Sequence, residues 1–137
     1  MSDLIPIERL RERLGQTAFS AWLGMTLESS DESGVVFRMP ARPEILGSPS
    51  TGALHGGVIA TLIDTAASYA VMARTGRSIA TVDMRVDYHR PALSPEYRVE
   101  GSIVRLGRTM ATADARVYDD KGALVASGRA VLMHLDR

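Results

Sequence analysis

Apolar positions recur with a helical period in two segments of the chain. Residues 6–20 carry a rough apolar stripe opposite a run of charged side chains, which predicts a surface helix with Pro6 in its first turn. Residues 56 to about 75 carry a much wider apolar band, so this second helix should be enclosed on most sides. Gly76 follows it as a stop signal.

Alternation with period two marks most of the remaining chain as strands, because successive side chains of a strand point to opposite faces. The predicted strands are residues 22–29, 35–39, 78 to about 90, 97–106, 109–118 and 123 to about 135. The short turns between them favour antiparallel neighbours. A single sheet wrapped around the apolar helix would bury that helix, so we predict an α+β fold.

Residues 41–54 read as a loop, because two prolines and two glycines among serines and threonines exclude regular structure. A loop of this length inside a small domain is usually functional or mobile. It delivers the chain directly to His55, at the start of the long helix.

Composition narrows the class of protein. The 137 residues suit one domain that spans 1–137. Sixteen basic and sixteen acidic residues give a formal net charge of zero, which argues against nucleic acid as a partner. Without cysteine there is no disulfide and no thiol nucleophile. His55, His89 and His134 lie far apart in sequence, so we expect no metal.

The first residues have neither the basic region nor the apolar core of a secretory signal. No apolar run reaches about 18 residues, the length that spans a membrane. We therefore expect a cytoplasmic protein with no membrane partner.

Asp64 is a lone carboxylate in the middle of the long apolar helix. A buried, unpaired charge there would be expensive, and desolvation would make the carboxylate a stronger base. Two other interpretations stay open: the side chain lies on an exposed strip of the helix, or it pairs with a basic residue.

The pair Gly56–Gly57 lies at the start of this helix, directly after His55. Glycines let a ligand approach the backbone, and free N–H groups at a helix start can stabilise an oxyanion. The alternatives are a tight turn that tolerates no side chain, and a histidine that caps or packs instead of catalysing.

Gly56 and Asp64 are separated by eight residues, which is about 12 Å along one helix. An oxyanion donor and a base must both reach one carbonyl and its attacking water, so one chain cannot supply both. If both act, the glycine end of one subunit meets Asp64 of another. The hypothesis therefore implies an antiparallel helix pair and an active site at a dimer interface, formed twice by symmetry.

These residues form a pattern that is known from one family. The segment 52–57 (Gly-Ala-Leu-His-Gly-Gly), with Asp64 nine residues after the histidine and Thr-Val-Asp-Met at 81–84, resembles the hotdog-fold acyl-CoA thioesterases. The nearest branch is the phenylacetate-pathway and human thioesterase-superfamily type. The resemblance covers roughly residues 20–135.

The resemblance implies a hotdog fold, in which the sheet wraps the long helix and subunits pair as a dimer or a dimer of dimers. The Gly56 N–H would polarise the thioester carbonyl with His55 close by, and Gly57 would contact substrate. Asp64 of the partner subunit would act as general base or nucleophile. Thr81 stands where the family has a serine or threonine that helps to position the water. CoA is part of the substrate, so no cofactor is implied.

One position departs from the family pattern. Members commonly carry an asparagine six residues before the histidine, and Pro49 occupies that place here, between Ser48 and Ser50. Either a neighbouring serine replaces the asparagine, or that contact is missing.

The phosphates of CoA need basic partners. The candidates are Arg90, Arg105 and Arg108, each of which could equally be an ordinary solvated turn residue.

We therefore predict hydrolysis of an acyl-CoA thioester to a free acid and CoA, with the acyl group left open. One rival is a non-catalytic acyl-CoA binding or sensing protein, which Pro49 favours. Another is a hotdog enoyl-CoA hydratase or dehydratase, although that chemistry typically uses a histidine facing an acid across the site.

Overall fold

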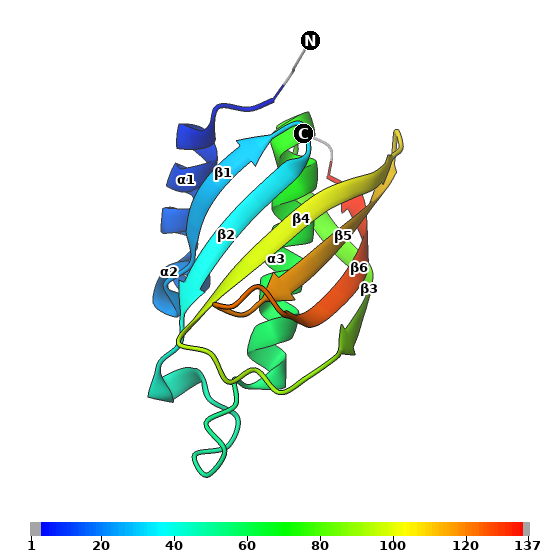
Figure 1. The fold of residues 1–137 in the computed structure, drawn as a ribbon. Helices are drawn as coiled ribbons and strands as arrows, with labels where there is room; N and C mark the ends of the chain where they lie inside the picture. The colour runs from blue at the N-terminus through cyan, green and yellow to red at the C-terminus, as the bar shows by residue number, and fades with distance from the viewer. Residues whose placement is uncertain (1–3, 136–137) are drawn as a thin grey trace.

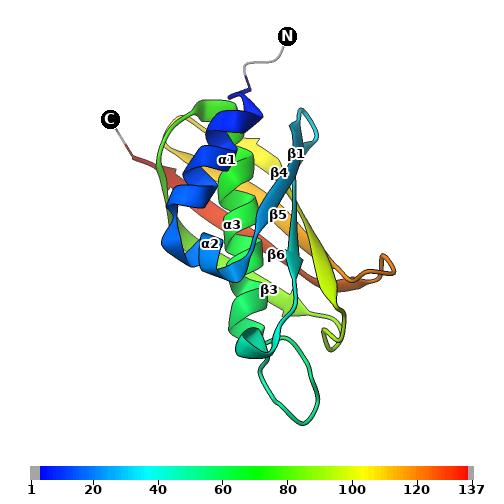
Figure 2. The same ribbon diagram turned by 90° about the vertical axis from the view of Figure 1, so that its left-hand side faces the viewer.

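The computed structural model describes residues 4–135, which form an antiparallel sheet curved around one long helix (Figures 1 and 2). The six strands lie in the order β1-β2-β4-β5-β6-β3. The predicted hotdog architecture is thereby confirmed. The elements are α1 (Ile7–Gln16), α2 (Ala18–Leu23), β1 (Thr26–Asp31), β2 (Gly34–Pro40), the 3-10 turn η1 (Pro43–Ile45), α3 (Gly56–Thr75), β3 (Ile79–Tyr88), β4 (Glu96–Leu106), β5 (Met110–Tyr118) and β6 (Leu124–His134).

The long helix α3 is the core of the molecule. Ten of its residues are buried, and it packs on β2 to β6. Gly101 allows this close approach, because a Cβ there would lie 2.2 Å from the Ala66 carbonyl oxygen. By length and composition alone α3 could cross a membrane, but more than half of the relevant stretch is buried inside the fold. The buried core helix of a folded domain meets the same criterion.

The N-terminal region differs from the prediction in one respect. The helix expected over 6–20 is interrupted at Thr17, whose extended backbone separates α1 from α2. Trp22 and Leu23 belong to α2, so their assignment to the first strand was wrong. Gly24 ends α2 with φ of 81°, a left-handed conformation that suits glycine, and the strand starts only at Thr26.

The sheet also corrects the prediction that strands joined by short turns are neighbours. This holds for β4, β5 and β6, but β3 does not pair with β4. Residues 89–95 instead carry the chain from β3 to β4, which pairs with β2, while β3 pairs with β6. The short connection therefore crosses past β6 and β5 and does not form a hairpin.

The loop at 41–54 is less irregular than predicted. It contains the η1 turn, and an isolated bridge joins Leu46 to Leu54. The Gly47 N–H donates to the Ala53 carbonyl at 2.8 Å. The segment between them projects beyond the end of the sheet (Figures 1 and 2).

The two edges of the sheet are treated differently. Arg11 of α1 donates to the carbonyls of Leu27 and Glu28 at 3.0 and 3.2 Å, so α1 shields the β1 edge. The free edge of β3 pairs with no strand in the described part of the chain. A bulge lies at Val82, whose side chain is 53% exposed. An open edge of ten residues is a template for pairing with another strand.

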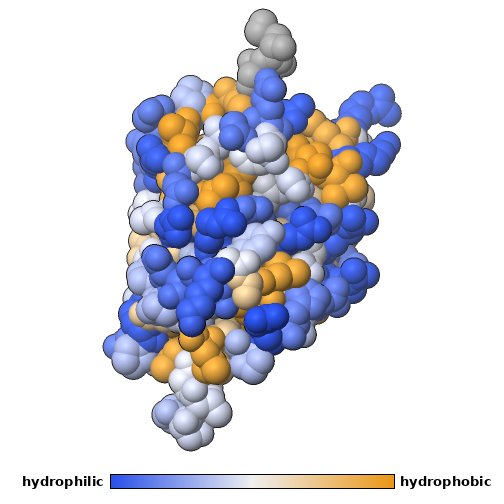
Figure 3. All heavy atoms as spheres, viewed as in Figure 1, coloured by the Kyte–Doolittle hydropathy of each residue, from blue (hydrophilic) through white to orange (hydrophobic). Residues whose placement is uncertain are grey.

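The outer face of the sheet is largely hydrophilic (Figure 3). Apolar side chains gather on it near the end of the β4–β5 hairpin. The exposed apolar residues of this region are Val104, Leu106, Met110, Met133 and Leu135. None of them belongs to the predicted site.

Candidate active site

The start of α3 is organised by His55. Its backbone is extended, and its Nδ1 accepts a hydrogen bond from the Gly57 N–H at 2.8 Å, so it is the N-cap of the helix. His55 therefore caps the helix, and this hydrogen bond uses only its Nδ1. Because Nδ1 is the acceptor, the ring proton of the neutral imidazole lies on Nε2. The exposed His55 side chain thus offers an N–H donor on the far side of its ring.

Gly56 supplies a free backbone donor. Its N–H has no hydrogen-bond partner among the described residues, and the residue is exposed at the positive end of the helix dipole. Its φ is not positive, so its backbone does not demand glycine. A Cβ at Gly56 would make ordinary contacts, 3.6 Å from the Tyr88 ring. The tight-turn explanation is therefore wrong for Gly56.

The same test gives a different answer for Gly57. A Cβ there would lie 3.0 Å from His55 Nδ1 and 3.2 Å from Cε1. A side chain at this position would press on the capping ring. Gly57 therefore serves the cap, whereas Gly56 could accept a Cβ without a clash and carries a free N–H.

A residue that the sequence did not single out contacts this turn. The Tyr88 hydroxyl, at the end of β3, donates to the Gly56 carbonyl oxygen at 2.7 Å. In the sequence Tyr88 is one more apolar member of an alternating strand. Only the fold shows that the end of β3 lies beside the start of α3.

Asp64 lies two turns further along α3. Its side chain is half-buried, and its Oδ1 accepts a hydrogen bond from the Thr81 hydroxyl at 2.7 Å. No basic side chain forms an ion pair with it in residues 4–135, so the pairing alternative is wrong. Asp64 lies on the one helix strip that the sheet leaves uncovered, where all the residues are small or polar and none is buried. This strip consists of Gly57, Thr61, Asp64, Thr65 and Ser68.

Two clusters thus lie at different heights along α3. One is His55–Gly56–Gly57 with Tyr88, and the other is Asp64 with Thr81. Because β3 runs antiparallel to α3, its end contacts the start of the helix and its beginning contacts the middle. The separation of about 12 Å between Gly56 and Asp64 keeps the clusters apart within one chain.

An apolar pocket of about 270 Å³ adjoins the first cluster. Its walls come from α2, η1 and the start of α3. The lining residues are Phe19, Trp22, Leu23, Glu44, Ile45, Leu46, His55, Gly57, Val58 and Thr61. The rings of Phe19 and Trp22 stack with their centroids 6.3 Å apart. The Arg42 guanidinium lies 4.4 Å from the Trp22 ring centroid and donates to the Trp22 and Leu23 carbonyls, which fixes that wall.

Residues 51–126, which contain both clusters, match the model of the family described as the thioesterase superfamily. The chain belongs to the thioesterase superfamily. The prediction of a thioester hydrolase is thereby confirmed at the level of the enzyme class.

Individual relatives agree with this assignment. The medium/long-chain acyl-CoA thioesterase YigI of Escherichia coli is 26% identical over 153 residues, covering 97% of this chain and 99% of YigI. A crystallographic structure of a protein from the thioesterase superfamily is 43% identical, with a TM-score of 0.89 over 94% of this chain and 97% of the other. The PaaI protein of the E. coli phenylacetic acid degradation operon shares the fold at 21% identity, with a TM-score of 0.87 over 95% of this chain and 93% of PaaI.

The remaining predicted residues of this thioesterase lie outside the two clusters. Ser48 and Ser50 are on the projecting loop, where their hydroxyls bond to each other at 2.9 Å. Arg90 follows β3 at the Gly56 end of the molecule. Arg105 and Arg108 lie at the β4–β5 hairpin, at the opposite end (Figure 1). All three arginines are exposed.

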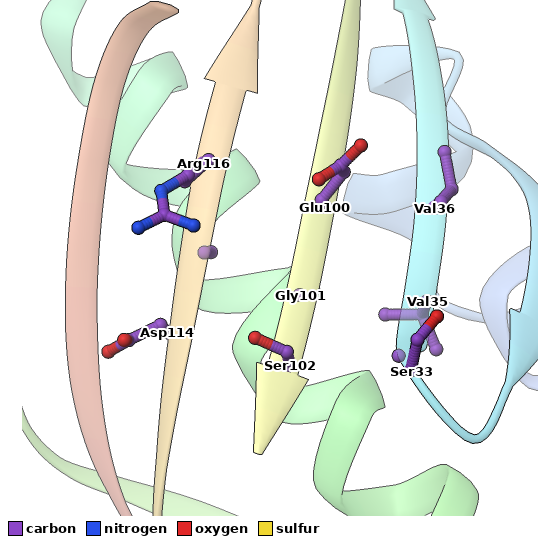
Figure 4. Close-up of a pocket in the computed structure, with 10 residues that line it drawn as sticks. Ser33, Val35, Val36, Glu100, Gly101, Ser102, Asp114 and Arg116 are labelled. Atoms are coloured by element: carbon purple, nitrogen blue, oxygen red, sulfur yellow. The ribbon is translucent and has the colours of Figure 1, made fainter. Parts of the chain in front are cut away.

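A second concavity of about 220 Å³ lies on the outer face of the sheet (Figure 4). Its lining includes the polar side chains of Glu100, Ser102, Asp114 and Arg116. Arg129 holds Asp114 in a two-point hydrogen bond, which lowers the pKa of that carboxyl. No predicted site residue lines this concavity, whereas His55 and Gly57 line the apolar pocket.

Proposed function

We propose that this thioesterase hydrolyses acyl-CoA to a free carboxylic acid and CoA at a site shared by two subunits. Asp64 of one subunit takes a proton from water as it attacks the thioester carbonyl. The Gly56 N–H of the other subunit stabilises the oxyanion, and CoA leaves as the thiolate. Attack by the Asp64 carboxylate itself, followed by hydrolysis of the anhydride, would give the same products.

The free Gly56 N–H is the observation that carries the proposal. Neither φ nor packing among the described residues requires glycine at this position, and the exposed backbone can be reached by a molecule from outside the chain. A backbone donor at a helix N-terminus costs no reorganisation when charge develops on the carbonyl oxygen. The Nε2–H of the neighbouring residue His55 would be a second donor.

Asp64 suits the role of base. Its contact with Thr81 occupies Oδ1 and fixes the carboxylate, which leaves Oδ2 for water. The Thr81 hydroxyl can also accept a hydrogen bond from that water. This arrangement supports the assignment of Asp64 and Thr81 to water activation.

The open edge of β3 supports the shared site. If two β3 strands pair antiparallel about a twofold axis centred near Met84 and Arg85, Thr81 lies opposite Tyr88 of the partner subunit. Tyr88 contacts Gly56 and Thr81 contacts Asp64, so this register brings the two clusters of different subunits together. The same pairing covers the exposed Val82. The assembly would be a dimer or a dimer of dimers.

The acyl chain would occupy the apolar pocket beside His55 and Gly57. Its aromatic and aliphatic walls suit an alkyl chain, and its volume of about 270 Å³ is too large for an acetyl group alone. The relative YigI is named for medium- and long-chain acyl-CoA, and we propose the same substrate class here.

The CoA nucleotide would lie between basic residues of both subunits. Arg90 is at the Gly56 end of its own chain, whereas Arg105 and Arg108 are at the opposite end. An antiparallel dimer would bring the β4–β5 hairpin of the partner subunit toward the Gly56 end of each chain. Ser48 or Ser50 would replace the carbonyl contact that Pro49 lacks. The reaction uses no cofactor.

Steady-state hydrolysis of acetyl-, octanoyl-, palmitoyl- and phenylacetyl-CoA, followed by release of the free thiol, tests the proposal. Asp64→Asn should lower kcat by at least about 100-fold, as expected for a general base. Glu32→Gln, which removes an exposed carboxylate from the β1–β2 turn, is the control and should change nothing. Tight acyl-CoA binding without hydrolysis would favour the alternative of a non-catalytic acyl-CoA binding or sensing protein. An Asp64→Asn variant as fast as wild type would overturn the mechanism.

A further inference from the structure

Tyr88, at the end of β3, is the residue from which the inference starts. Its hydroxyl lies 2.7 Å from the Gly56 carbonyl oxygen, yet the side chain is 54% exposed. A half-exposed tyrosine gains little from burial, so its hydrogen bond is the contact that stands out.

The Gly56 carbonyl belongs to the same peptide group as the Gly57 N–H. That N–H donates to His55 Nδ1 at 2.8 Å. Three groups are therefore bonded in series: the Tyr88 hydroxyl, the Gly56–Gly57 peptide and the His55 imidazole. Hydrogen bonds in such a chain polarise and strengthen one another.

The next peptide toward the N-terminus is fixed as well. The His55 carbonyl accepts from the Val58 and Ile59 N–H groups at 2.9 and 3.2 Å. The helix therefore holds the His55–Gly56 peptide, and Tyr88 holds the Gly56–Gly57 peptide. Together these contacts set the direction of the Gly56 N–H.

We propose that Tyr88 is a positioning residue for the oxyanion donors. Its hydroxyl ties the Gly56–Gly57 peptide to β3, which aims the Gly56 N–H and holds the His55 ring with Nε2–H as donor. This inference rests on the proposed function of Gly56. It also ties the donors to β3, the strand that the proposed dimer would pair.

Tyr88→Phe tests the inference, because phenylalanine keeps the ring and its packing and removes only the hydroxyl. In the full-length protein, on the acyl-CoA that wild type turns over best, kcat should fall about tenfold while KM stays within about twofold. Tyr118→Phe is the matched control, because Tyr118 is also partly exposed, stacks with Arg98 and donates no hydrogen bond in residues 4–135. It should change neither constant.

A second readout separates this inference from the proposed function. Amide hydrogen exchange of Gly57 should be several-fold faster in Tyr88→Phe than in Tyr118→Phe, because the relay to His55 loosens. Unchanged Gly57 exchange, or an unchanged kcat, would overturn the positioning role even if wild type is an active thioesterase. If wild type hydrolyses no acyl-CoA, the proposed function fails, and Gly57 exchange alone decides whether Tyr88 holds the turn.

Discussion

Removing the N–H of Gly56 without disturbing the fold is the sharpest mutational test of the oxyanion donor. Proline does this, because it lacks the backbone hydrogen and is favoured at the first position of a helix. The residue before a proline must be extended, and His55 already has φ −60° and ψ 133°. No internal hydrogen bond is lost, since the Gly56 N–H has no partner in residues 4–135.

The expected effects on stability and activity are opposite in sign. A proline at a compatible position raises the free energy of unfolding by about 0.4–1 kcal/mol, because it restricts the unfolded chain. Loss of one oxyanion donor lowers kcat by about 10²–10³-fold, equivalent to roughly 3–4 kcal/mol. A more stable and nearly inactive Gly56→Pro protein is therefore the predicted result.

Gly56→Ala is the matched control, because alanine keeps the N–H and adds a Cβ that makes only ordinary contacts with Tyr88. Thermal unfolding and steady-state kinetics on both variants separate the effect of losing the N–H donor from the effect of crowding the substrate with an added side chain. Alanine should retain most of the activity that proline abolishes. A Gly56→Pro variant that folds and keeps wild-type kcat would refute the role of this N–H, and equal losses in both variants would point to crowding.

Three further changes test other parts of the site and fold. Thr81→Val should lower kcat about tenfold and Thr81→Ser should restore it, because only the hydroxyl contacts the carboxylate; kcat for the two variants settles this. Val58→Phe should narrow the apolar pocket and shift kcat/KM toward shorter acyl chains, by about fourfold for each methylene that no longer fits, as a chain-length series would reveal. Asp114→Asn should lower the free energy of unfolding by about 0.5 kcal/mol at pH 7. Because Arg129 lowers the folded-state pKa of Asp114, that difference should be complete above about pH 4 and should shrink as the pH falls toward the folded value, as urea unfolding at pH 7 and at a series of pH values below 4 can measure.

The wide apolar band of α3 and the period-two alternation after it were enough to predict a sheet around a helix. They were enough because burial on nearly all sides leaves a distinct pattern. The place of β3 could not be predicted in this way. The connection at 89–95 is only seven residues long, and its length does not show that β4 pairs with β2 and β5 while β3 lies at the edge beside β6.

The candidate site divides along similar lines. His55, Gly56 and Asp64 were recognisable because glycines and a carboxylate are unusual in an apolar helix. Tyr88 and the aromatic wall of the pocket were not, since tyrosine in a strand and tryptophan near a helix end are common in any core. Their roles depend on contacts between segments that are far apart in sequence, such as the 32 residues that separate Tyr88 from Gly56.

The claim that each active site combines two subunits can be tested by mixing two inactive variants. Gly56→Pro lacks the oxyanion donor and Asp64→Asn lacks the base, so neither homodimer should turn over acyl-CoA. Co-expression in equal amounts gives heterodimers in about half of the pairs, each with one intact site and one doubly defective site. We predict recovery of about a quarter of wild-type activity. The two variants carry different tags, so that pairing between them can be shown. If they pair and the activity stays at the level of the two inactive homodimers, the shared site is contradicted.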